Sequence, residues 1–64
     1  MTISQIEKGE HIKDVRVSVG RNTETDGSIY KVGNDYYIVI DSTWLTPKNK
    51  RKLDYDDCLR YELI

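Results

Sequence analysis

Alternating apolar and polar residues predict the clearest strand in the chain. Val15, Val17 and Val19 share one face of an extended segment, and polar side chains occupy the other face. Ile12 has the opposite parity from these valines. We therefore expect a bulge near Lys13 that turns the Ile12 side chain toward the core.

Two weaker patterns lie before and after that strand. Ser4 and Glu7 have the spacing of a capping box, which predicts one helical turn or an irregular strand that ends at Gly9. Residues 20–28 contain two glycines and otherwise polar side chains, so they predict a long exposed loop.

A hairpin is predicted over residues 29–41, where two β-branched and aromatic runs flank a short polar turn. The turn is centred on Gly33-Asn34 or on the next dipeptide, and the two choices give different registers. We favour Gly33-Asn34, because glycine at the first central position suits a type II′ turn. This register places Ile29 opposite Ile38.

The segment after the hairpin turn is apolar on both faces. We therefore expect Tyr36 to Ile40 to be a central strand, or one covered on both sides. Trp44 and Leu45 predict a fourth short strand that ends at Pro47. The charged run Lys48 to Lys52 predicts a turn or loop tip.

The last residues predict a helical turn and a strand. Asp54 is placed to cap a single helical turn through Cys58. Leu59, Tyr61 and Leu63 then alternate with polar residues, which predicts a final strand.

The order of these elements resembles that of the small SH3-like barrels, a group that includes SH3, Tudor and KOW-type modules. The resemblance rests on Val15–Val19, the hairpin Ile29–Asp41, and Asp54–Cys58 leading into Leu59–Leu63. It implies a mostly β fold and a general binding role. The SH3 ligand motif ALYDY and a Tudor-type aromatic cage are absent, so no ligand site is carried over. The rival arrangement is a four- or five-stranded antiparallel sheet with the N-terminal turn packed on one face.

Composition supports a single small β domain over residues 1–64. The chain has no Ala and no Phe, so the best helix former is missing while β-branched and aromatic residues are abundant. Cys58 is the only cysteine, which fits a reducing compartment, and we expect a cytoplasmic location. The start lacks a basic segment followed by an apolar stretch, so neither export nor membrane spanning is expected. The missing Ala and single Pro suggest an AT-rich coding sequence, as in many phages and mobile elements.

The formal net charge of −1 conceals an uneven distribution along the chain. Residues 1–42 carry a net −2, residues 43–53 carry +4 with no acidic group, and residues 54–64 carry −3. A basic segment therefore lies between two acidic ones, and it forms a local positive field that attracts anionic groups.

No catalytic or metal-binding constellation stands out. His11 is the only histidine, and no nucleophile motif accompanies it or Cys58. Asp54, Asp56 and Asp57 lack the glycine and glutamate positions of a Ca²⁺ loop. We therefore expect neither an enzyme nor a cofactor, and no small-molecule substrate is evident.

These observations favour a non-enzymatic module that binds a protein partner, as an accessory or inhibitory protein of a phage or mobile element would. Exposed aromatic residues dominate protein interfaces, and basic side chains add charge complementarity. The expected partner-binding residues are Tyr37, Trp44, Lys48, Lys50, Arg51 and Lys52. The alternative is a small nucleic-acid-binding barrel that uses the basic segment 48–52 for phosphates and neighbouring aromatic rings for stacking.

Overall fold

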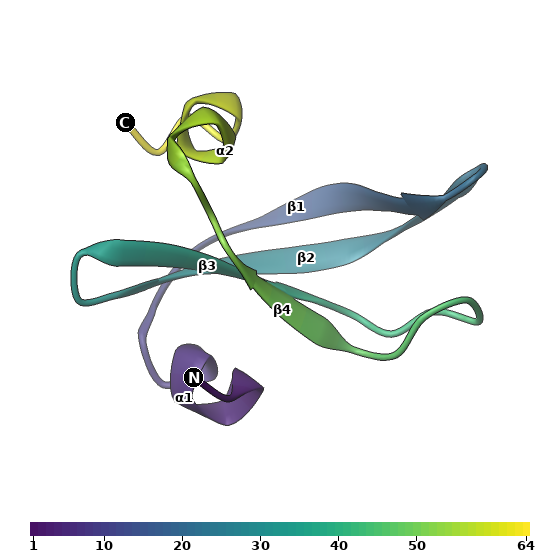
Figure 1. Cartoon of the computed structure of the whole chain (residues 1–64), viewed down its shortest axis with the longest axis horizontal. Helices are drawn as coiled ribbons and strands as arrows, with labels where there is room; N and C mark the ends of the chain where they lie inside the picture. Colours follow the sequence, from purple (N-terminus) through teal and green to yellow (C-terminus); the bar gives the residue numbers. More distant parts are fainter.

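The computed structural model describes residues 1–64 as a four-stranded antiparallel sheet with one short helix on each face (Figure 1). The elements are α1 Ile3–Glu7, β1 Glu10–Gly20, β2 Thr23–Val32, β3 Asp35–Ile40, β4 Asn49–Lys52 and α2 Tyr55–Arg60. The strands lie in the order β1-β2-β3-β4, so each pairs with its neighbour in sequence. The fold is mostly β, as predicted. The sheet is open, which agrees with the rival arrangement, and the closed SH3-like barrel is not confirmed.

The main core lies between the sheet and α2. Ile29 and Ile38 sit opposite each other on β2 and β3, and both are fully buried. Leu53 and Cys58 complete this buried cluster from the α2 side. The apolar side chains of β1, such as Val15, pack around it and remain partly exposed.

A smaller apolar layer lies on the opposite face, under α1. Ile6 is the buried residue of α1, and Val39 on β3 is nearly inaccessible to solvent. Neighbouring strand residues point to opposite faces, so Ile38 and Val39 serve the two layers separately. The prediction that Tyr36–Ile40 is a central strand, or one covered on both sides, is confirmed, because β3 lies between β2 and β4 and has a buried residue on each face.

The bulge predicted in the first strand is also confirmed. The β1–β2 register shifts between His11 and Lys13, which leaves Ile12 as the extra residue on β1. Ile12 packs against the main core cluster. The bulge therefore reverses the parity of the strand and brings an otherwise outward-facing isoleucine into the core.

The β2–β3 hairpin has the favoured register, with Ile29 opposite Ile38 and the turn at Gly33-Asn34. Gly33 has a φ of +63°, whereas Asn34 does not enter the positive-φ region. A type II′ turn requires this combination, because only its first central residue is left-handed.

The predicted long loop over residues 20–28 is wrong. β1 continues to Gly20 and β2 begins at Thr23, so only two residues form the turn between them. Asn22 adopts a φ of 58°, a left-handed conformation that Asn tolerates well. The threonines of this segment are half-buried and alternate with exposed acidic residues, which is the period of a strand.

The predictions for residues 44–52 are also wrong. Trp44 and Leu45 lie in the loop between β3 and β4 and form no strand. The run Lys48 to Lys52 is not a turn, because Asn49–Lys52 forms β4. The backbone of β3 has one side free after pairing with β2, and this charged segment pairs with it.

At the C-terminal end, Asp54 caps α2 as predicted, but the expected strand Leu59–Leu63 is wrong. The Asp54 carboxylate accepts a hydrogen bond from the backbone N–H of Asp57, and α2 continues to Arg60. The helix closes with the Leu63 N–H donating to the Cys58 carbonyl at 2.8 Å and Glu62 at a φ of 59°. This is a Schellman motif, and its last residue, Leu63, packs against the main core cluster.

At the other end, the single helical turn predicted at the N-terminus is present as α1. Its capping box joins Thr2 and Gln5, so the predicted pair Ser4 and Glu7 is wrong by two residues. Placing the cap earlier leaves Ile6 on the side of the helix that faces the sheet.

Candidate functional site

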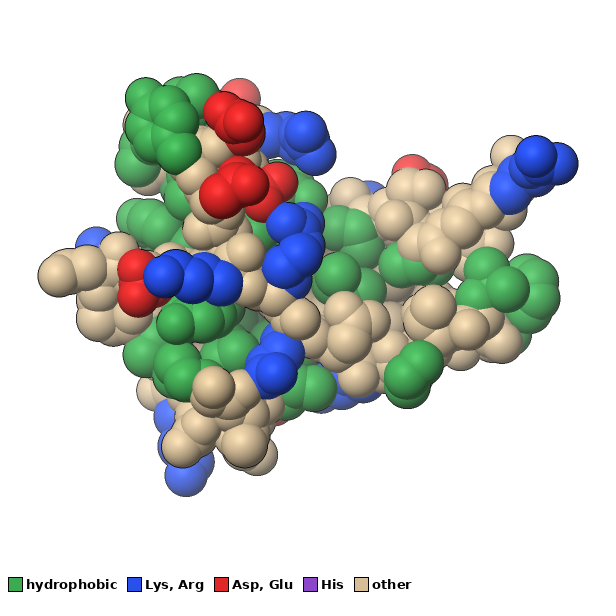
Figure 2. All heavy atoms as spheres, viewed as in Figure 1, with side chains coloured by type: hydrophobic (Ala, Val, Ile, Leu, Met, Phe, Trp, Pro, Cys, Tyr) green, Lys and Arg blue, Asp and Glu red, His purple; other side chains and the backbone are tan.

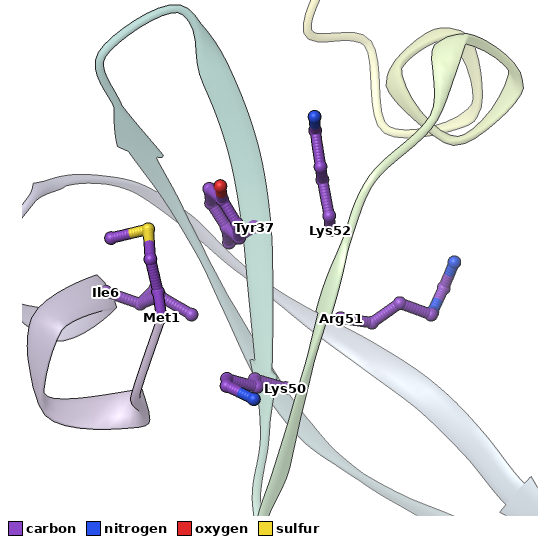
Figure 3. A pocket seen from close by; sticks show the side chains of 6 residues that line it. All are labelled: Met1, Ile6, Tyr37, Lys50, Arg51 and Lys52. Atoms are coloured by element: carbon purple, nitrogen blue, oxygen red, sulfur yellow. The ribbon is translucent and has the colours of Figure 1, made fainter.

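A groove lies between α1 and β4, with a volume of about 190 Å³ (Figure 3). Pairing of β3 with β4 places Tyr37 opposite Lys52, and Lys50 follows on the same face two residues away. The residues that line it are Met1, Ile6, Tyr37, Lys50, Arg51 and Lys52. We call this the lysine groove, and the side chains of three of the six predicted partner-binding residues, Tyr37, Lys50 and Lys52, meet there.

The lysine groove has an apolar side and a basic side. Met1 and Ile6 point into it from the α1 side, and the Tyr37 ring lies between them and Lys52 (Figure 3). The Lys52 ammonium lies 3.5 Å from a carboxylate oxygen of Asp35, whereas Lys50 forms no ion pair. One cation of the groove is therefore free to attract an anionic group.

The other two predicted cations are engaged elsewhere. Lys48 pairs with Glu7 of α1, its Nζ lying 3.2 Å from the carboxylate. Arg51 points away from the groove and toward α2, where its guanidinium donates to the Asp57 carboxylate at 2.7 Å (Figure 3). These pairs join the basic segment to both helices, so most of its +4 charge is balanced within the fold.

Asp57 is the buried member of this arrangement. Its side chain is only 9% exposed, and one carboxylate oxygen accepts hydrogen bonds from Arg51 and from the backbone N–H of Asp54. The hydrogen bond from Arg51 lowers the pKa of Asp57 against the opposing effect of burial, and the Asp54 backbone hydrogen bond lowers it further. The ionised Asp57 side chain therefore connects β4 to the start of α2.

The tip of the β3–β4 loop presents the most exposed aromatic side chain. Trp44 is 83% exposed, and Leu45 beside it is 45% exposed. The Thr43 hydroxyl oxygen accepts hydrogen bonds from the backbone N–H groups of Leu45 and Thr46, and the Thr43 N–H donates to the Thr46 carbonyl at 2.8 Å. We call Thr43–Thr46 the Trp44 turn, an ordered turn that holds the indole in solvent.

Leu45 connects the Trp44 turn to the neighbouring hairpin. A Cβ added at Gly20, near the end of β1, would lie 2.8 Å from Leu45 Cδ1. The Leu45 side chain therefore occupies the space that a side chain at position 20 would need. The β1–β2 turn and the Trp44 turn thus extend together from the same end of the sheet (Figure 1).

The predicted partner-binding residues do not form one surface. Tyr37, Lys50 and Lys52 meet at the lysine groove. Trp44 belongs instead to the β3–β4 loop, which extends away from both helices (Figure 1). Hydrophobic side chains are visible at the tip of this loop (Figure 2). The chain thus offers two separate candidate contacts.

A further exposed surface, not predicted from the sequence, lies on α2. Tyr55 is 69% exposed and Leu59 is 49% exposed. Their spacing of four residues places them on one face of a helix. This spacing is present in the sequence, but the predicted strand over Leu59–Leu63 obscured it.

A second hollow of about 510 Å³ lies on the α2 side of the sheet, with a partly apolar floor that includes Val17 and Ile40. Three arginines line it. Arg16 pairs with Asp26, and Arg51 is held by Asp57, so these two positive charges are balanced.

The single histidine and the single cysteine lie on opposite faces of the sheet, and the Asp14 carboxylate beside His11 also accepts a hydrogen bond from the Ser28 hydroxyl at 2.9 Å. His11 lies on the α1 face of the sheet, where its ring meets the Tyr30 ring edge-on and Nε2 lies 2.9 Å from Asp14. Cys58 is buried on the α2 face. Burial raises the pKa of its thiol, and the negative charge of Asp57 adds to the effect. No group of three or more His, Cys, Asp or Glu side chains is arranged to hold a metal ion.

The chain matches no protein-family model, no curated protein and no solved structure. Neither of its two helices has the length and apolar character required to cross a bilayer.

Proposed function

We propose that this protein is a non-enzymatic module that binds a protein partner through the Trp44 turn. The observation that carries the proposal is the 83% exposure of Trp44 on an ordered loop tip. Tryptophan is enriched among the residues that dominate interface energetics. The complementary partner surface is an apolar cavity large enough for an indole.

The expected contribution of Trp44 follows from its area. Burial of a Trp side chain removes about 150–250 Å² from water, and at about 25 cal/mol/Å² this corresponds to about 4–6 kcal/mol before ordering costs. Alanine substitution at an interface anchor costs about 2 kcal/mol or more. We therefore expect Trp44→Ala to weaken partner binding by about 30-fold or more.

Thr43 acts as a positioning residue in this proposal. Its hydroxyl oxygen accepts two backbone N–H groups and fixes the turn before a partner arrives. Pre-ordering reduces the entropy lost on binding. Thr43→Val, which removes the hydroxyl, should weaken binding, and Thr43→Ser should retain it.

The test compares immobilised wild-type protein with Trp44→Ala and Tyr55→Ala as baits in lysate, with quantification of the proteins retained. Tyr55 is a matched control, because it is an exposed aromatic residue on a different element. A saturable partner that wild type and Tyr55→Ala retain and Trp44→Ala loses supports the proposal. Identical retention by all three baits contradicts it.

Nucleic-acid binding at the lysine groove is the second candidate function. It is favoured by the Tyr37 ring lying beside Lys50 and Lys52 on one face of the sheet. On duplex DNA, each phosphate contact contributes about −0.9 to the slope of log K against log salt. Four contacts would therefore give a slope of about −3.6. Since Lys50 is the one cation of the basic segment 48–52 that has no ion pair, this candidate predicts a slope near −0.9, and Lys50→Glu should abolish binding.

The proposal includes a cytoplasmic location and an accessory or inhibitory role in a phage or mobile element. The single cysteine supports a reducing compartment. The absence of Ala and the single Pro support an AT-rich source.

A further inference from the structure

The outer face of α2 carries apolar side chains that the fold does not use. The inner face of this helix packs on the sheet through Cys58, and Asp57 faces Arg51. Tyr55 and Leu59 point outward instead, with 69% and 49% exposure. Figure 2 shows hydrophobic side chains gathered at α2, with acidic and basic side chains beside them.

Charged residues follow the same spacing along one edge of this apolar pair. Asp56 and Arg60 are also four residues apart, each one position after Tyr55 and Leu59, so they form a parallel row on the adjacent helix face. Asp56 forms no ion pair. Arg60 is 71% exposed and reaches only Asp57, at 4.0 Å. The row thus has one negative end and one positive end, both available.

We propose that α2 pairs antiparallel with α2 of a second copy of this chain about a twofold axis. A twofold interface is self-complementary, so each residue meets the partner residue on the other side of the axis. With the axis passing near the middle of the helix, Tyr55 meets Leu59 of the second copy. The same operation sets Asp56 against Arg60 of the second copy, and the symmetry forms that ion pair twice.

This arrangement explains why the charged row, Asp56 and Arg60, has the same spacing as the apolar pair, Tyr55 and Leu59. Reversing the helix exchanges the positive and negative ends, so opposite charges meet only in the antiparallel orientation. A parallel pairing would set each charge against its equal. The proposal does not depend on the Trp44 turn, which lies on a different element.

The test is sedimentation equilibrium of the full chain over a range of concentrations. The wild type should shift from 7.5 kDa toward twice that mass as its concentration rises. Asp56→Arg and Arg60→Asp should each weaken self-association by about tenfold, because each creates two like-charge contacts across the axis. The double variant Asp56→Arg/Arg60→Asp restores opposite charges and should return to within about threefold of wild type.

A second set of variants keeps the test decisive if a charge reversal disturbs the helix. Tyr55→Ala combined with Leu59→Ala removes only exposed apolar groups, so circular dichroism should remain native while self-association is lost. Trp44→Ala should leave self-association unchanged. A wild type that is monomeric at all concentrations overturns the proposal, as does a natively folded charge-swapped double variant that fails to recover. Either result leaves partner binding by the Trp44 turn unaffected.

Discussion

Replacing Gly27 with alanine would set a methyl group against a fully buried side chain of the main core. The new Cβ would lie 3.0 Å from Ile38 Cδ1, 3.3 Å from Ile38 Cγ1 and 3.5 Å from Val15 Cγ2. Ile38 is 0% exposed and packs in a cluster with Leu53 and Cys58, so its neighbours limit its movement. The substitution should therefore destabilise the fold.

The magnitude combines two opposing effects. Overpacking a core costs about 1–3 kcal/mol, and alanine recovers about 0.5–1 kcal/mol relative to glycine in a strand. We expect Gly27→Ala to lower the free energy of unfolding by about 1 kcal/mol, which shifts Tm by about 4–8 °C. Ile38→Val should cost about 0.5–1.5 kcal/mol alone. Since valine lacks Cδ1, the double variant should be about 1 kcal/mol more stable than the sum of the single effects predicts.

Urea unfolding followed by far-UV circular dichroism measures this cycle. Tryptophan fluorescence is a poor probe, because Trp44 is already exposed in the folded state. Gly33→Ala is the matched control: Gly33 has a φ of +63° and nothing lies within 4 Å of an added Cβ, so its cost is conformational. That cost should add to the cost of Ile38→Val. If Gly27→Ala and Ile38→Val are also additive within about 0.3–0.5 kcal/mol, the steric reasoning is refuted.

Four further predictions concern single side chains. Trp44→Ala should change the free energy of unfolding by no more than about 0.5 kcal/mol in thermal denaturation, because the indole makes little contact with the fold. Glu62→Gly should stabilise by about 0.5–1 kcal/mol in the same assay, since Glu62 has a φ of 59° that glycine adopts without strain, and a lower Tm would contradict this. The pKa of Asp57 is lowered in the fold, so its ionised form contributes stability above its ordinary value of 3.8, and this contribution is lost as the pH falls through the lower folded pKa. In urea titrations at pH values below 3.8, Asp57→Asn should therefore lose less stability on acidification than the wild type does. An unchanged pH profile would refute the role of the ionised Asp57 carboxylate. Burial raises the pKa of Cys58, so alkylation at pH 8 should be slow until denaturant unfolds the chain, and rapid alkylation of the native protein would show an accessible thiol.

The parts of the fold that were predicted correctly depend on local rules. The Gly33-Asn34 turn determines its own register, because the conformation of the turn decides which residues face each other. The bulge at Ile12 was predictable from one change of parity. In both places a few neighbouring residues contain the necessary information.

The incorrect parts depend on partners distant in sequence. Residues 49–52 are polar and mostly charged, a composition typical of a loop. They form a strand because β3 offers unpaired backbone groups and because Leu53, the next residue, is anchored in the core. Leu59–Leu63 alternates like a strand, yet the Asp54–Asp57 capping box and the Schellman ending stabilise a helix and a turn. Here tertiary contacts and caps outweighed the alternation.

The candidate site was predicted in residue types more than in arrangement. The sequence identified Trp44, Tyr37 and the basic segment, and the structure places them in two separate contacts. Which cations are paired was not predictable, because the partner of Lys48 is Glu7, far away in sequence. Of the acidic residues that closely follow the basic segment, Asp54, Asp56 and Asp57, only Asp57 pairs with it.

The shortness and charge of β4 have a consequence for solubility. An outermost strand exposes unpaired backbone groups that can recruit a strand from another molecule, and natural sheets block this with short edges, lysines and bulges. β4 has four residues, three of them Lys or Arg, and β1 at the opposite edge contains two register irregularities. The basic segment therefore protects the sheet from edge-to-edge aggregation and amyloid-like growth. Substitutions that neutralise it to probe binding also remove this protection.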